Sequence, residues 1–250
     1  MKEFISNDNY PIGEIRLGGQ AETENDDYEK FRDIVKDTYV KNGVDQELIE
    51  QFIKHNKQVE YFVVDYSKQE KFDAREREIA ILAAIFHDIA KGGDFLGHGK
   101  NGGKIAEKIL QENGVSFELA YSVRLAIERH MGGERSYPGR MAEKTYGEGF
   151  RFPIPRTRVE QIVYECDILT QLTPEGFEKI LLLREKDRGN RKEDEEVAKE
   201  KEITREEAAT LSALQSARES YELIYLVSIK IDATKLWEKI QEKYRDVLAK

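Results

Sequence analysis

Residues Ile79–Lys91 have the sequence Ile-Ala-Ile-Leu-Ala-Ala-Ile-Phe-His-Asp-Ile-Ala-Lys, in which an unbroken apolar run leads into His87 and Asp88. Upstream, Asp73 and Glu76 have the spacing of a capping box, in which each side chain accepts a hydrogen bond from the other residue's backbone amide. This spacing predicts a helix that begins after Asp73 and ends at the His-Asp pair. Because histidine and aspartate are both common metal ligands, the end of this helix is a candidate metal site.

Two of the other histidines lie on the apolar faces of predicted helices. His55 follows Phe52 by three residues and precedes Val59 by four, so the three side chains share one helix face. His130 similarly closes an apolar face one turn after Ile127. The chain has only four histidines, and the fourth is His98. For any one of them, a hydrogen-bonded core histidine is the alternative to a metal ligand.

Asp167 also falls on an apolar helix face, because Val163 and Val159 precede it by one and two turns. An isolated buried carboxylate costs several kcal/mol unless it is paired or binds a metal. A buried salt bridge is the alternative for this residue taken alone. The combination with an adjacent His-Asp pair and further inward-facing histidines favours a metal site.

The helical pattern extends over most of the chain, and no segment shows convincing strand alternation, so we expect an all-α protein. Residues 1–25 have no sustained period and are predicted to be an irregular N-terminal segment. Residues 26–183 are predicted to form the helical core, with an irregular glycine-rich stretch over 92–103. Residues 184–250 are predicted to form a C-terminal extension that packs on the core. It begins with a charged stretch (a solvated helix, an exposed loop or a disordered insertion) and ends in a helix around 236–248.

Composition limits the classes of function. The chain has 250 residues, a net charge of −9 and a single cysteine, Cys166. The acidic balance argues against binding to nucleic acid or anionic membranes through charge. No apolar run approaches the roughly 18 residues of a membrane helix, and one cysteine suits a reducing cytoplasm. Whether the chain forms a homo-oligomer stays open.

In order, the candidate ligands form the pattern H…HD…H…H…D, which resembles the HD superfamily of metal-dependent phosphohydrolases. The resemblance covers roughly residues 55–170 and implies a helical bundle with the ligands on facing sides, followed here by a C-terminal helical extension. It implies one or two divalent ions of Fe, Mn, Ni, Co or Zn. The ligands that it implies are His55, His87, Asp88, His98, His130 and Asp167.

The same resemblance assigns roles within this set. His55, His87, Asp88 and Asp167 would bind the first ion, and Asp88 would bridge to a second ion bound by His98 and His130. His98 follows Asp88 by only ten residues, so it could instead contact substrate or orient a ligand.

The reaction that the resemblance implies is phosphoester hydrolysis by a metal-activated hydroxide, on a nucleotide or related small molecule. Asp88 and Lys91 are the expected catalytic residues. Lys91, Arg129 and Arg135 are expected to bind phosphate oxygens, although surface charge is the alternative for each arginine.

Three other functions fit the sequence less well. A di-iron oxygenase similar to myo-inositol oxygenase would use a similar ligand set. A single-strand nuclease of the HD type is a second alternative, against which the acidic charge argues. A non-enzymatic domain that senses a nucleotide or scaffolds a partner is the third.

Overall fold

The computed structural model describes residues 28–92, 96–132, 143, 145–148, 150–186 and 188–249. These residues contain eleven helices and no strand, which confirms the predicted all-α fold. The predicted N-terminal segment, residues 1–25, lies outside the described residues. Within the described part of the chain, no helix has both the length and the apolar character that crossing a membrane requires.

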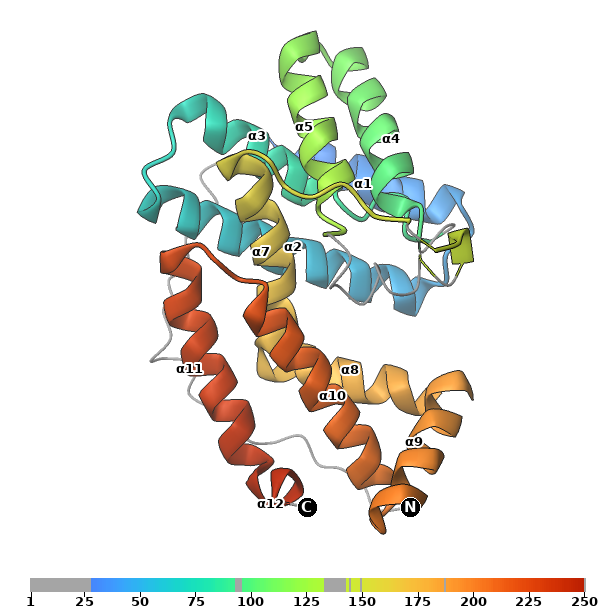
Figure 1. The fold of residues 1–250 in the computed structure, drawn as a ribbon. Coiled ribbons are helices and arrows are strands. Elements are labelled where there is room, and N and C mark those ends of the chain that lie inside the picture. The colour runs from blue at the N-terminus through green and yellow to red at the C-terminus, as the bar shows by residue number, and fades with distance from the viewer. Residues whose placement is uncertain are drawn as a thin grey trace.

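The helices form two groups that meet at one central helix. The first group consists of α1 (Glu29–Lys41), α2 (Gln46–Gln69), α3 (Ala74–Phe86), α4 (His98–Glu112) and α5 (Phe117–Arg129). The second group consists of α8 (Pro174–Lys186), α9 (Arg188–Lys201), α10 (Arg205–Glu222), α11 (Val227–Lys243) and α12 (Arg245–Leu248). Between them, α7 (Arg158–Leu172) packs against α2, α3 and α5 on one side and α8, α10 and α11 on the other (Figure 1).

The helix starts follow from the local sequence. Three capping boxes form, at Asp73 with Glu76 as predicted, and also at Thr157 with Glu160 and at Thr204 with Glu207. Each box satisfies backbone amides that have no partner inside the helix. The side chains of Asp45 and Ser116 cap α2 and α5 by accepting a hydrogen bond from one backbone amide each. These caps determine where the helices that hold the candidate ligands begin.

One hydrophobic core includes both groups of helices. In α7, side chains such as Ile162 and Leu169 are fully buried, and Leu214 of α10 and Ile229 of α11 belong to the same cluster. Burial of an aliphatic side chain of this size stabilises the fold by about 1.5–3 kcal/mol. The C-terminal helices therefore share the core of the bundle, while the domain boundaries at residues 25 and 183 stay a prediction.

The C-terminal helices are also attached to α7 through a buried carboxylate. Glu165 accepts hydrogen bonds from the backbone amides of Tyr225 and Leu226, at 2.9 Å each, where α11 begins. A negative charge is favourable at this position because the first amides of a helix lack internal partners. Glu165 is two residues from Asp167, so this contact fixes the helix that presents a candidate ligand.

The glycine-rich stretch is not irregular throughout, which corrects the prediction for residues 92–103. From His98 onward it forms the first turns of α4. A Cβ atom on Gly103 would lie 2.9 Å from the backbone oxygen of Arg124, and one on Gly102 would lie 3.5 Å from that of His87. Glycine lowers helix propensity by about 1 kcal/mol. Here the absence of a side chain at Gly103 lets α4 approach α5 closely.

The charged segment after residue 184 is helical, since α9 occupies residues 188–201. Asp194 of α9 is buried and binds Arg184 of α8 at 2.7 Å, and it accepts a hydrogen bond from Ser212 of α10. The last predicted helix begins nine residues earlier than expected, as α11, and is interrupted at Tyr244 before α12. Sequence reasoning missed this start because α11 has no side-chain N-cap.

Gly176→Ala tests the packing of α8 on α7. A Cβ atom on Gly176 would lie 1.8 Å from the backbone oxygen of Thr170, so the two helices would have to separate. We expect a loss of about 2–3 kcal/mol of unfolding free energy and a fall of roughly 5–10 °C in Tm, measured by circular dichroism. Glu178→Ala, at an exposed position of the same helix, should change Tm by no more than about 1–2 °C. A Tm for Gly176→Ala equal to that of the wild type would contradict this packing.

Candidate metal centre

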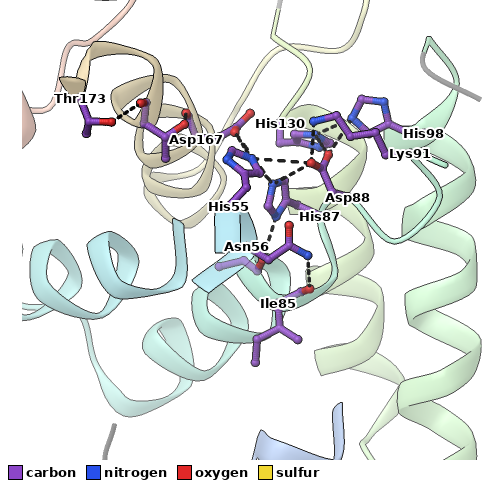
Figure 2. Close-up of polar contacts among 12 residues, drawn as sticks. His55, Asn56, Ile85, His87, Asp88, Lys91, His98, His130, Asp167 and Thr173 are labelled. Atoms are coloured by element: carbon purple, nitrogen blue, oxygen red, sulfur yellow. Dashed lines mark hydrogen bonds and ion pairs between the residues drawn. The ribbon is translucent and has the colours of Figure 1, made fainter. Parts of the chain in front are cut away.

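The candidate ligands come from five separate elements of the bundle and converge on one point (Figure 2). His87 and Asp88 follow the last residue of α3, where a turn replaces the helix. Asp167 lies in the second half of α7, and His55 lies in the first half of α2. The remaining two are His98, the first residue of α4, and His130, the residue after α5.

One group of potential ligand atoms consists of His55, His87 and Asp88, whose atoms lie within 4.8 Å of one another. The two Nε2 atoms are 3.2 Å apart, and each is 3.6 Å from Asp88 Oδ2. Asp167 Oδ1 is 3.0 Å from His55 Nε2 and 3.9 Å from His87 Nε2. These four side chains therefore direct two nitrogens and two carboxylate oxygens toward a common space.

A second group consists of Asp88, His98 and His130. His98 Nε2 is 3.2 Å from Asp88 Oδ1, and His130 Nε2 is 3.8 Å from the same oxygen. The two imidazole nitrogens are 3.1 Å apart. Asp88 thus lies between the groups, with Oδ2 facing the first and Oδ1 facing the second.

Backbone hydrogen bonds determine which ring nitrogen faces each group. His87 Nδ1 lies 2.7 Å from the carbonyl oxygen of Ala84, and His130 Nδ1 lies 2.6 Å from that of Ile127. A carbonyl oxygen can only accept a hydrogen bond, so both Nδ1 atoms hold the proton and donate. Both Nε2 atoms consequently present a lone pair, which is the arrangement found around protein-bound metals.

The chemistry of the cluster fits a cation. Among the described residues, none makes a hydrogen bond of ordinary geometry with Asp88 Oδ1, although this oxygen is buried. It faces the Nε2 atoms of His98 and His130, and a buried acceptor without a donor is costly. A cation would bind these acceptors together. Oxygen and nitrogen donors without thiolate suit several first-row divalent metals, whereas Cys166 is buried in the hydrophobic core.

Burial and neighbouring charges keep the candidate ligands in the protonation states that bind a metal. Burial would raise the pKa of the Asp88 carboxyl, but Lys91, His87 and His98 outweigh it and hold that pKa well below its usual range. Burial lowers the pKa of His87, and burial with the nearby His98 and His87 rings lowers the pKa of His130 to about 3. Near neutral pH, the carboxylate is ionised and these rings are neutral, as metal binding requires.

Lys91 lies directly beside Asp88. The turn after α3 includes a hydrogen bond from the Lys91 amide to the Asp88 carbonyl, and the Lys91 Nζ atom is 2.6 Å from Asp88 Oδ2. Burial lowers the pKa of this ammonium, but Asp88 and Asp167 more than compensate and raise it. Lys91 is therefore a fixed positive charge at the edge of the cluster.

The two predicted arginines are in different situations. Arg129 binds the buried carboxylate of Glu160, which also completes the capping box of α7. This pairing gives the Arg129 guanidinium a structural partner. Arg135 lies outside the described residues. Phosphate binding by either arginine stays a prediction.

Two residues behind the cluster were not identified from the sequence. The Tyr39 hydroxyl of α1 donates a hydrogen bond to the Asp88 carbonyl at 3.0 Å. The Asn56 amide, next to His55 in α2, donates to the Ile85 carbonyl at 3.4 Å. Both side chains are buried, and they fix the backbone of the His-Asp turn. No local pattern could have identified Tyr39, since the contact joins positions 49 residues apart.

Comparison with known proteins agrees with this geometry. Residues 52–172 match the family described as HD domain, and all six candidate ligands lie within that range. Neither the curated proteins nor the solved structures contain a significant match to the chain.

Metal removal tests the cluster directly. Because ions at about one hundred times their Kd stabilise the folded state by about 2.7 kcal/mol, adding Mn²⁺, Ni²⁺ or anaerobic Fe²⁺ to EDTA-treated protein should raise Tm by roughly 5–10 °C. Asp88→Ala should abolish the rise, whereas Asp246→Ala, at an exposed position of α12, should preserve it. An equal rise in both variants would show that the ions bind elsewhere.

Proposed function

Because residues 52–172 form an HD domain, a domain typical of metal-dependent phosphohydrolases, we propose that this chain hydrolyses a phosphoester of a nucleotide or a related small molecule. The observation that best supports the proposal is the position of Asp88. Its two carboxylate oxygens face two separate groups of imidazole nitrogens, as a carboxylate shared between two ions would.

The chain's own residues would divide between two ions. His55, His87, Asp167 and Asp88 Oδ2 would hold the first, and His98, His130 and Asp88 Oδ1 would hold the second. Fe, Mn, Ni, Co and Zn are all compatible with these donors. When bound, such ions supply an acidified water and Lewis acidity toward the transferring phosphoryl group.

The protein's contribution is positioning and charge. Asp88, held by Tyr39 and the turn after α3, would keep the two ions at a constant separation. The backbone bonds of His87 and His130 would keep their rings oriented without reorganisation during the reaction. Lys91 would attract the anionic phosphate and bind an oxygen that does not react.

The oxygenase alternative would use the same ligand set and the same lysine after the His-Asp pair, so the phosphate-release assay is what distinguishes it from hydrolysis. The net charge of −9 weighs against a nuclease that binds a long polyanion. Cytoplasmic location and homo-oligomer formation stay predictions.

Phosphate release is the decisive assay. Protein reconstituted with Mn²⁺, Ni²⁺ or Fe²⁺ should release phosphate from at least one of a panel of nucleoside mono- and diphosphates and dinucleotides. Asp88→Ala should lower the rate about a hundredfold or more, since it removes the ligand shared by both ions. No release with any metal, from protein that binds two irons with a mixed-valent signal, would refute hydrolysis in favour of the oxygenase.

The number of ions can be measured separately from activity. After dialysis against Mn²⁺, elemental analysis should find about two ions per wild-type chain, as in two-metal hydrolases. His130→Ala removes a ligand of the second group only, so this variant should retain about one. A wild-type ratio of one, or an unchanged ratio in His130→Ala, would contradict the division of ligands described above.

A further inference from the structure

We propose that Lys179 of α8 is a second phosphate-binding lysine opposite Lys91, so that a helix outside the matched domain completes the active site. The inference rests on the proposed function, because it names a further residue that binds the substrate. Residues 52–172 are the matched range, and α8 begins at Pro174.

The start of α8 is held close to the metal centre. Thr173, immediately before α8, lies 3.5 Å from the side-chain amide of Gln58, a residue one turn after His55 in α2. The Thr173 hydroxyl also donates to the Thr170 carbonyl of α7 at 2.7 Å and accepts a hydrogen bond from the Gly176 amide at 3.1 Å. The first turn of α8 is therefore attached to the two helices that present His55 and Asp167.

The face of α8 that looks back toward α7 is identified by Gly176. A Cβ atom at this position would overlap the backbone oxygen of Thr170, so Gly176 lies against α7 just beyond Asp167. Lys179 follows Gly176 by three residues, and residues three apart share a helix face. The Lys179 side chain consequently extends from the part of α8 that is directed toward the metal centre.

The surroundings of the Lys179 ammonium agree with this placement. The side chain is half-buried, and its pKa is lowered by burial and by the ammonium of Lys91, against the opposing effect of Asp88 and Asp167. All three charged neighbours belong to the metal centre or its edge. The Lys179 ammonium is therefore near enough to Lys91 and the two carboxylates to interact with them electrostatically.

The two lysines differ in how their charge is compensated. Lys91 forms an ion pair with Asp88 at 2.6 Å. Within the described part of the chain, Lys179 forms no ion pair. A half-buried ammonium beside another cation is unfavourable until an anion binds between them. A phosphate group supplies that anion, and its oxygens accept charge-assisted hydrogen bonds from lysine.

Binding of inorganic phosphate to the metal-loaded protein tests the inference without turnover. By isothermal titration calorimetry, Lys179→Met should weaken phosphate binding about tenfold, as expected for one lost charge-assisted hydrogen bond. Lys179→Arg, which keeps the charge, should bind within about threefold of wild type. Lys239→Met, at an exposed position of α11, should bind as the wild type does.

A positioning role alone would not give this pattern, because Lys179→Met and Lys179→Arg both alter the side chain while only one removes the charge. With a substrate from the phosphate-release assay, Lys179→Met should raise KM about tenfold and lower kcat by a smaller factor. Bound-metal ratios of the variants should match the wild type, and their melting temperatures should not fall below it. If Lys179→Met does not fold, Lys179→Gln replaces it.

The outcomes separate the two proposals. Wild-type phosphate affinity in folded Lys179→Met and Lys179→Gln would overturn the role of Lys179, even if the protein proves to be a phosphohydrolase. A wild-type protein that binds no phosphate at millimolar concentration would overturn it too. Lys179-dependent phosphate binding in a protein that hydrolyses none of the substrates would support the anion site and refute the proposed reaction.

Discussion

The buried carboxylate of Asp88 is the constraint on which the rest of the structure depends. A carboxylate removed from water costs several kcal/mol unless compensating charges and donors surround it. Lys91 meets one oxygen at 2.6 Å, and imidazole nitrogens lie around both oxygens. These partners come from α2, α4, α5 and the turn after α3, so the helices must converge for the group to be tolerated. The packing of the helices and the geometry of the candidate metal centre therefore depend on each other.

The helices beyond residue 172 also contribute to the position of the candidate ligands. Glu165 and Asp167 lie two residues apart on α7, and the first receives the start of α11 while the second faces His55. Consecutive helical residues point about 100° apart, so residues two positions apart point toward nearly opposite sides. One helix can therefore contact the C-terminal extension with one residue and the metal centre with the other. The start of α11 is thus attached two residues from Asp167. The same arrangement places α8 where Lys179 can face the cluster.

Close helix contacts explain where simple pattern rules failed. Gly102 and Gly103 weaken the helical signal, yet they lie within α4, and a side chain at Gly103 would collide with the Arg124 backbone of α5. The resulting approach brings His98, the first residue of α4, to 3.2 Å from Asp88. Glycine lowers the stability of this helix, but it occurs in the helix whose first residue must lie near the buried carboxylate.

The sequence by itself determined the helical class, most helix starts and the identity of the side chains that cluster. Capping boxes and apolar periods depend on residues within one or two turns, so they can be recognised along the chain. Only the tertiary structure decided that the Asp88 oxygens face separate groups, that Tyr39 supports the Asp88 backbone, and that Arg129 pairs with Glu160. It also brought Lys179 toward the cluster. These relations join residues tens of positions apart, and their geometry follows from how the helices pack, which no local pattern encodes.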